Sequence, residues 1–301
     1  MNNISAVIVV KGYPIHLAET LDSLHTWVAE IVLVDIGMSP LLEKVLINYK
    51  NLRIEKIDKE VLYVEQIREE TKAFAKHPYV LFMDPDEVIP ATLATYIQSN
   101  YEKYDYLIFP RKNIIFGKWI EHARWWPDYQ IRFFKKTAVH WKDELHAQPK
   151  ATGNGHKLDA DPALAIMHYN YDSVAEYFAK AVRYAKSEQT THELSLPHTV
   201  DQGISEFMSR FFLEKGYKDN VHGFYLSFFQ MMYPFLVYFS EYQRKGSHDI
   251  DQTELIQAVE QLFAKGHAET MHWMLEHDLY PQNKRAKKKV LKKLISVLQE
   301  K

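Results

Sequence analysis

Residues 4–10 read ISAVIVV, a nearly continuous run of β-branched residues. A strand covered on both faces has this composition, because neither of its sides has to face water. Further apolar runs follow, and segments with helical spacing separate them. The runs are residues 31–34, 52–57 and 79–83, and the helical segments are residues 17–27, 41–49 and 64–75. Strands that alternate with helices predict an α/β fold with a doubly wound, mostly parallel sheet and flanking helices.

The pattern changes at about residue 105, after which shorter strands and then helices are expected. The expected strands are residues 106–109, 129–134 and 139–141, and the expected helices are residues 173–187, 203–215, 221–242 and 251–279. The polar segment 245–249 is a candidate boundary. We therefore predict an α/β domain over residues 1–170, a helical extension packed on it over 171–245, and a C-terminal helical appendage over 246–301.

The composition of the 301-residue chain excludes several classes of protein. Its 37 basic and 39 acidic side chains nearly cancel, so a chain-wide basic field for binding nucleic acid is not expected. The absence of cysteine excludes disulfides, thiolate metal sites and thiol nucleophiles, and it permits a cytoplasmic location. No apolar stretch reaches about 18 residues, so no transmembrane helix is expected. The N-terminus lacks the basic region of a signal peptide.

The strongest local motif is residues 80–87, VLFMDPDE, in which an apolar strand is followed by Asp84, Asp86 and Glu87. Three carboxylates so close together are costly unless a cation or several hydrogen-bond donors compensate them. Carboxylate oxygens suit Mg²⁺ or Mn²⁺, and these ions also bind diphosphates. Asp35 ends another predicted strand at the same sheet edge, where parallel sheets bind ligands.

This acidic motif has two enzymatic interpretations and one structural one. In the first, a metal neutralises the departing diphosphate of a nucleotide sugar. In the second, Asp84 is the nucleophile of a phosphohydrolase and Asp86 its acid/base. In the third, Asp86 or Glu87 caps the helix that begins near Ala91. We favour the first, because the phosphohydrolase motif usually follows the first strand and this motif follows about the fourth.

A second motif is residues 124–134, RWWPDYQIRFF, which mixes aromatic rings with polar side chains. Sugar faces stack on aromatic rings such as Trp126, and Asp128 could act as general base towards an acceptor hydroxyl. Gln130 and Arg132 alternate with apolar residues along the strand that follows. The structural alternative is a tryptophan-rich corner of the core with an aspartate in a turn.

The order of these segments resembles glycosyltransferase family 2, and more narrowly the bacterial lipopolysaccharide-core β-1,4-glucosyltransferase-like subgroup. The resemblance covers about residues 3–245. The matching segments are residues 4–10, 30–35, 81–87, 111–113, 117–120, 126–134, 168–171, 215–219 and 223–224, together with His146.

This resemblance implies a GT-A fold, which is Rossmann-like, and an inverting, metal-dependent transfer of a hexose. The donor would be a nucleotide sugar, and we expect a UDP-sugar. The acceptor would be a glycan or a lipid-linked molecule of cell-envelope polysaccharide synthesis. The residues implied for the donor are Asp35, Arg68 and Asp84, and those for a Mn²⁺ or Mg²⁺ ion are Asp84, Asp86 and His168. Asp128 would be the catalytic base, with Glu144 as its rival. Acceptor or diphosphate contacts are implied for Trp126, Gln130, Arg132 and His146.

The chain departs from the family pattern in three places, all on the nucleotide side. Residues 12–14, GYP, replace the usual Asn-Glu, the second aspartate after Asp35 is missing, and Glu69 replaces an asparagine. These changes predict an altered donor or lost activity. A non-catalytic glycan-binding or scaffold protein is therefore a further hypothesis.

The last residues, 284–301, carry eight basic side chains and one acidic side chain, with apolar residues at helical spacing. Such a basic amphipathic helix can bind an anionic leaflet. The tail could attach the protein peripherally to the inner face of the plasma membrane, and we slightly favour the alternative, the solvated basic face of a docked helix. The aromatic run 224–242 is expected to pack in the core, although it could add an interfacial surface.

Overall fold

The computed structural model describes residues 3–61, 64–141, 149–187, 195–246 and 249–279. The chain divides into two compact units. Unit 1 consists of Met1–Trp119 and Trp126–Asn170, and unit 2 of Ile120–Trp125 and Tyr171–Lys301. The chain therefore enters unit 2 for six residues, returns to unit 1, and leaves it again after Asn170.

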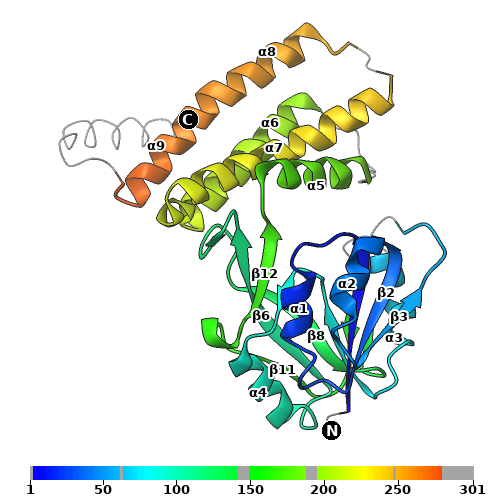
Figure 1. Cartoon of the computed structure of the whole chain (residues 1–301). Coiled ribbons are helices and arrows are strands. Elements are labelled where there is room, and N and C mark those ends of the chain that lie inside the picture. The colour runs from blue at the N-terminus through cyan, green and yellow to red at the C-terminus, as the bar shows by residue number, and fades with distance from the viewer. Residues whose placement is uncertain (1–2, 62–63, 142–148, 188–194, 247–248, 280–301) are drawn as a thin grey trace. The chain divides into compact units, whose positions relative to one another are not determined.

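Unit 1 is built on a mixed sheet with the strand order β3-β2-β1-β4-β8-β6-β12-β5 (Figure 1). Strand β1 (Ile4–Gly12) pairs in parallel with β2 (Glu30–Met38) on one side and with β4 (Tyr79–Met83) on the other. Strand β3 (Leu52–Lys56) continues this parallel half. The four strands predicted for the first third of the chain and their parallel order are confirmed.

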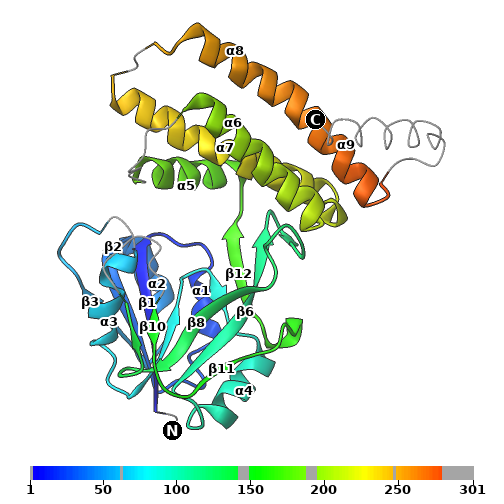
Figure 2. The ribbon, with the colours of Figure 1, turned by 180° about the vertical axis from the view of Figure 1, so that it is seen from behind.

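The other half of the sheet is largely antiparallel and is seen from behind in Figure 2. Strand β8 (Asp128–Lys135) runs antiparallel to both β4 and β6 (Tyr106–Ile115). Strand β12 (Ile166–Tyr171) lies next to β6 and pairs with β5 (Glu87–Val88). The remaining short strands are β7 (Lys118–Trp119), β11 (Gly155–Lys157), and β9 (Val139–His140), which pairs with β10 (Lys150–Ala151).

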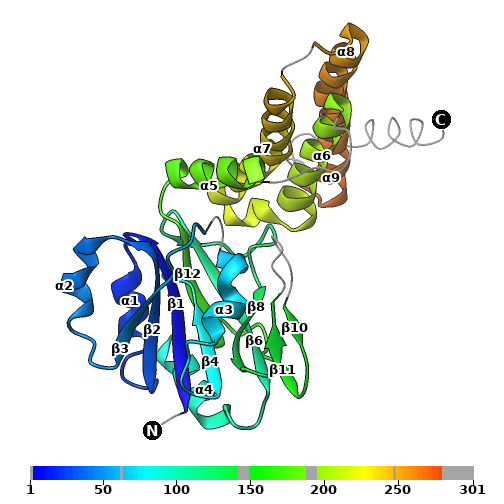
Figure 3. The same cartoon turned by 90° about the vertical axis from the view of Figure 1, so that its right-hand side faces the viewer.

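Both faces of the sheet are covered, as the composition of residues 4–10 predicts. Along β1, Ile4, Ala6 and Ile8 pack into the core beneath α1 (Leu17–Asp22), whereas Val7 packs into a second core on the other face. The first core also takes side chains from α2 (Glu43–Leu46) and α4 (Ala91–Asn100). The second takes Ile67 and Ala75, which flank α3 (Arg68–Lys72) (Figure 3).

Three helices of unit 1 are shorter than their apolar spacing predicts. After Asp22, for example, the backbone continues in turns, in which Leu24 N donates to Leu21 O at 3.0 Å and Trp27 N to Leu24 O at 3.0 Å. Leu24 and Val28 are nonetheless buried. Apolar spacing therefore identifies which side chains face the core, whereas the helix ends depend on the local hydrogen bonds.

Unit 2 is helical, as expected from residue 171 onwards. Its helices are α5 (Val174–Ser187), α6 (Leu196–Met208), α7 (Val221–Arg244), α8 (Gln252–Glu260) and α9 (Gly266–Glu276). Helix α6 begins seven residues before its predicted start, because Ser195 caps it by accepting from His198 N at 3.3 Å. In the described ranges, no helix combines the length and apolarity needed to cross a membrane.

Candidate functional site

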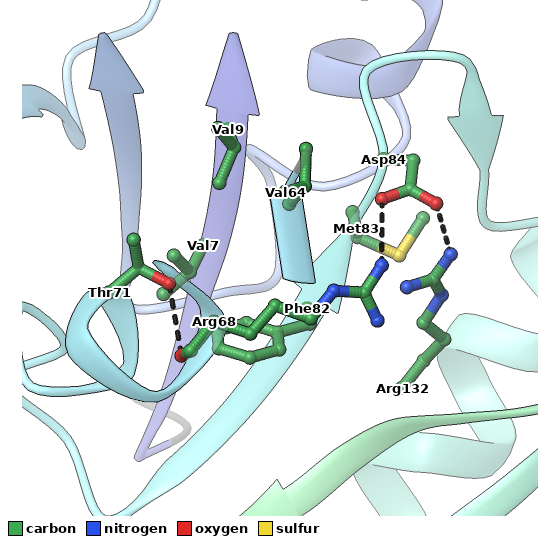
Figure 4. A pocket seen from close by; sticks show the side chains of 9 residues that line it. All are labelled: Val7, Val9, Val64, Arg68, Thr71, Phe82, Met83, Asp84 and Arg132. Atoms are coloured by element: carbon green, nitrogen blue, oxygen red, sulfur yellow. Dashed lines mark hydrogen bonds and ion pairs between the residues drawn. The ribbon is translucent and has the colours of Figure 1, made fainter. Parts of the chain in front are cut away.

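A small pocket opens where the carboxyl ends of β1 and β4 meet β8, at the sheet edge where parallel strands bind ligands (Figure 4). Its wall is apolar on one side and charged on the other. The lining residues are Val7, Val9, Val64, Arg68, Thr71, Phe82, Met83, Asp84 and Arg132. Three of the residues predicted from the sequence, Arg68, Asp84 and Arg132, therefore lie together.

Asp84 directly follows β4 and is surrounded by guanidinium groups. Its Oδ2 accepts a hydrogen bond from Arg132 Nη2, its Oδ1 lies 3.5 Å from Arg68 Nη2, and Arg111 Nη1 is 3.9 Å away (Figure 4). Burial raises the pKa of Asp84, but the charges of Arg132, Arg68 and Arg111 outweigh it and hold this pKa well below its usual range. Asp84 is therefore ionised at neutral pH.

Glu87 lies in β5 and accepts hydrogen bonds from two of these arginines. Its side chain is completely buried, and Oε1 accepts from Arg111 Nη1 at 2.9 Å and from Arg132 Nη2 at 2.6 Å. Oε2 accepts from the backbone N–H of Asp84 at 3.0 Å, which closes the turn between β4 and β5. The alternative that Asp86 or Glu87 caps the next helix is wrong, because α4 begins after Pro90 without a side-chain cap.

Asp128 stands opposite Arg111 in the register of β8 and β6. Its Oδ2 accepts from Arg111 Nε at 2.8 Å, from Arg111 Nη2 at 2.6 Å and from Asn113 Nδ2 at 3.2 Å. Oδ1 accepts from Gln130 Nε2 at 2.8 Å. Burial opposes ionisation, but Arg111 and the hydrogen bonds from Gln130 and Asn113 lower the pKa of Asp128.

Arginine side chains balance the negative charge of the carboxylates in this site. Three guanidinium groups, from Arg68, Arg111 and Arg132, face three carboxylates, from Asp84, Glu87 and Asp128. This network is neutral without any further cation. Of the two means of compensation that the sequence leaves open, a cation or several donors, the donors are present, because strands β6 and β8 bring Arg111 and Arg132 to these carboxylates. The predicted metal stays a prediction.

Asp86 and His168 form a different arrangement beside this network. Asp86 Oδ1 is buried without a hydrogen-bond partner, 3.6 Å from His168 Nε2. Asn113 donates to the Asp128 carboxylate, so its Oδ1 faces His168 Nδ1 at 2.7 Å and accepts from Asn170 Nδ2 at 3.3 Å. This hydrogen-bond pattern assigns the proton to His168 Nδ1. In the neutral ring, the lone pair of Nε2 then faces a carboxylate oxygen.

Two electron-rich atoms that face each other fit a cation between them, and a hydrogen bond to the far ring nitrogen is typical of a metal-bound histidine. Within the described part of the chain, however, no group of three or more His, Cys, Asp or Glu side chains is placed to hold a metal. Of the predicted set, Asp84 faces arginines, and Asp86 and His168 remain. A Mg²⁺ or Mn²⁺ ion here would take its other ligands from a diphosphate and water.

The other predicted residues lie around the network or beyond the described chain. Asp35 Oδ1 accepts from the N–H groups of Gly37 at 2.8 Å and Met38 at 2.6 Å, so it shapes the end of β2. Trp126 packs edge to face against Trp119, with 5.4 Å between ring centroids. Nucleotide contact by Asp35 and acceptor contact by Trp126 stay predictions. Glu144 and His146 lie outside the described residues, as does the basic tail 284–301.

From the sequence alone, no role in the site was predicted for Arg111 or Asn113, although both donate hydrogen bonds to Asp128. The available signal was the polar run 111–113 within a mostly apolar strand, in which Arg111 and Asn113, two residues apart, share one face of the sheet. That signal cannot name the partner strand, which depends on the register between β6 and β8.

No protein-family model matches the chain. Among solved structures it is similar to residues 1–349 of S. aureus TarS, with 15% identity and a TM-score of 0.40 over 91% of this chain and 86% of that chain. It is also similar to the same protein in complex with UDP (14% identity, TM-score 0.41, 83% of this chain and 94% of that one). The complex with UDP-GlcNAc gives 14% identity and a TM-score of 0.41 over 91% and 86% of the two chains. Likeness at this level assigns neither substrate nor mechanism.

Proposed function

We propose that this protein is a glycosyltransferase that moves a hexose from a nucleotide sugar, UDP-linked by expectation, to a glycan or lipid-linked acceptor with inversion at the anomeric carbon. The observation that carries the proposal is the pocket of Figure 4, in which Arg68, Asp84 and Arg132 meet at the carboxyl ends of parallel strands. Asp128 belongs to the same network, since Arg111 contacts both Asp128 and Asp84. Asp86, 3.6 Å from His168, lies in the turn between Asp84 and Glu87.

The pocket suits a nucleoside diphosphate. Val7, Val9 and Phe82 offer an apolar wall for a base or ribose, and the guanidinium groups can bind phosphate oxygens in pairs. Burial and the neighbouring Arg132 lower the pKa of Arg68, and its described ionic contact, with Asp84, is long at 3.5 Å. A diphosphate oxygen beside Arg68 would favour its charged form.

Asp86 and His168 are the residues that would hold a Mn²⁺ or Mg²⁺ ion, and such an ion would neutralise charge on the diphosphate as it leaves. This cation stays a proposal that rests on the unpaired Asp86 oxygen and the orientation of His168.

Asp128 is the proposed base. Its Oδ2 is occupied by Arg111 and Asn113, whereas among the described residues Oδ1 accepts from Gln130 alone and has a second lone pair that could accept from an acceptor hydroxyl. The hydroxyl proton would pass to Oδ1 as the acceptor oxygen bonds to the anomeric carbon and the bond from that carbon to the diphosphate breaks. Arg111 and Asn113 would hold the carboxylate in place during this step. The subgroup, the polysaccharide product and the cellular location also stay predictions.

A thermal-shift screen tests this function with UDP-glucose, UDP-galactose, UDP-GlcNAc and GDP-mannose, each with and without Mn²⁺. A ligand at 100 times its Kd stabilises a protein by about 2.7 kcal/mol, which is readily seen as a rise in Tm. We expect a rise with one UDP-sugar that Mn²⁺ increases and that Arg68→Ala removes, whereas the exposed control Lys59→Ala keeps it. No shift with any nucleotide would favour the non-catalytic hypothesis, and phosphate release from aryl phosphates that Asp84→Asn abolishes would favour the phosphohydrolase.

A further inference from the structure

Unit 2 carries a continuous group of aromatic side chains that reaches its surface. Phe207, Phe211, Tyr217, Phe224 and Phe228 are linked by successive ring contacts, with centroid separations of 5.3–6.4 Å. Phe224 is 51% exposed and Phe228 is 42% exposed. The expectation that the aromatic run 224–242 packs in the core was therefore wrong for these side chains.

One further apolar side chain, Val221, extends this surface and is exposed. Val221, Phe224 and Phe228 recur at intervals of three and four residues, so they share one side of α7. We call the surface made by Tyr217, Val221, Phe224 and Phe228 the aromatic face. A contiguous apolar patch of this kind marks an interaction site more often than isolated surface residues do.

Close packing on the opposite side of α7 fixes the orientation of this helix. Gly223 packs so tightly that a Cβ on it would lie 1.7 Å from the carbonyl oxygen of Gly216. Leu226 and Ser227, on the same side, are completely buried. Because the helix is fixed by a close backbone approach, the phenylalanines must point outward.

The charge around the aromatic face favours an anionic partner. Lys215 and Lys218 are exposed in the segment that precedes α7, against one exposed acid, Glu214. Asp219 is buried and binds the backbone and ring of His122, so it adds little surface charge. Aromatic rings flanked by lysines suit the headgroup region of a bilayer, where rings enter the apolar boundary and ammonium groups meet phosphates.

We propose that the aromatic face docks on the surface of an anionic phospholipid bilayer. The observations that carry this proposal lie in unit 2 and do not depend on the proposed catalysis. The basic sequence 284–301 would add electrostatic attraction, but the phenylalanines and lysines named above make the aromatic face a docking surface in its own right.

Flotation of the full-length protein with phosphatidylcholine vesicles that contain 30% or no phosphatidylglycerol tests the proposal. We expect binding to the anionic vesicles and a loss of roughly tenfold or more in Phe224→Ser/Phe228→Ser, because two inserted rings are removed. Lys215→Glu/Lys218→Glu is expected to weaken binding in the same direction. Phe263→Ser, which changes a 71% exposed ring on another helix, is the matched control and should bind as the parent does.

Equal vesicle binding by Phe224→Ser/Phe228→Ser and the parent would overturn the proposal and assign any binding to other segments. Failure of the parent to float would overturn it as well. Light scattering after size exclusion tests a second copy of this chain as the alternative occupant. A dimer of the parent that Phe224→Ser/Phe228→Ser dissociates would overturn the proposal and identify the aromatic face as a contact between copies. Circular dichroism verifies that each variant is folded, which we expect because the changed rings are largely exposed.

Discussion

Arg68 is the residue whose charge is least balanced in the site. Its described ionic contact is with Asp84 at 3.5 Å, whereas Arg111 and Arg132 each bind two carboxylates at shorter range. Removing Arg68 therefore leaves Asp84 paired. We expect Arg68→Ala to fold normally and to weaken nucleotide-sugar binding by roughly 10- to 100-fold, the cost of one or two charge-assisted hydrogen bonds. Calorimetric titration measures this, with Lys59→Ala as the control, and an unchanged Kd would remove Arg68 from the donor site.

Asp128 differs from Asp84 because the described partner of its Oδ1 is the neutral amide of Gln130, whereas both oxygens of Asp84 face guanidinium groups. We expect Asp128→Asn to reduce the rate of sugar transfer by about 10²- to 10⁴-fold, the usual contribution of a general base. The amide oxygen can still accept from Arg111, so donor affinity should stay within a factor of about two. Initial rates together with donor titration measure the two effects. A variant that keeps its transfer rate would show that another group removes the proton.

Acid should destabilise the protein through Asp84 and Asp128. Arginine neighbours lower the pKa of both carboxyl groups in the folded state, so the stability from these pairs is complete above the unfolded pKa of about 4. It is lost as the pH falls from there towards the folded values. Urea unfolding between pH 7 and pH 3 should show this decline. Asp84→Asn should decline less steeply, and a parallel decline would mean that Asp84 contributes nothing to it.

At the scale of elements, the two-residue strand β5 joins the arginine network to the Asp86–His168 pair. Glu87 stands opposite His168 in the register of β5 and β12, and its carboxylate binds Arg111 and Arg132. We expect Glu87→Ala to lower the free energy of unfolding by about 3–5 kcal/mol, because two guanidinium groups lose a buried partner. Denaturant titration measures the change.

Asp86 gives the matched control in the same turn. Its Oδ1 is buried without a hydrogen-bond partner, so Asp86→Asn should cost less than about 1 kcal/mol or stabilise the fold. Similar losses for Glu87→Ala and Asp86→Asn would contradict the contrast between a carboxylate that binds two guanidinium groups and one whose buried Oδ1 accepts no hydrogen bond.

At the scale of the whole molecule, the chain visits unit 2 briefly at Ile120–Trp125 before it returns to the candidate site. Asp219 anchors this visit, because its carboxylate accepts from His122 N at 2.8 Å and from Glu121 N at 3.4 Å. We expect Asp219→Ala to lower the free energy of unfolding by about 1–3 kcal/mol, since backbone donors lose their partner. Donor affinity should be unchanged, because every lining residue of the pocket belongs to unit 1.

Thermal unfolding and donor titration of the same sample separate these two effects. Glu121→Ala, which removes an exposed side chain from the same segment, should leave both quantities unchanged. Loss of donor binding in Asp219→Ala, with folding intact, would show that the anchoring of this segment controls the pocket.

The sequence alone determined the parallel half of the sheet, its burial on both faces and the place of Asp84 at its edge. The apolar pattern of each strand is local, and the alternation of strands with helices predicts that the strands run in parallel. It also determined that the second half is helical. Only the tertiary structure decided that Arg111 and Arg132 neutralise Asp84, Glu87 and Asp128, and that Phe224 and Phe228 face outward. The first depends on the register of β6 and β8, which places Asp128 opposite Arg111, 17 positions away. The second depends on the close contact of Gly223 with Gly216, which no helical spacing reveals.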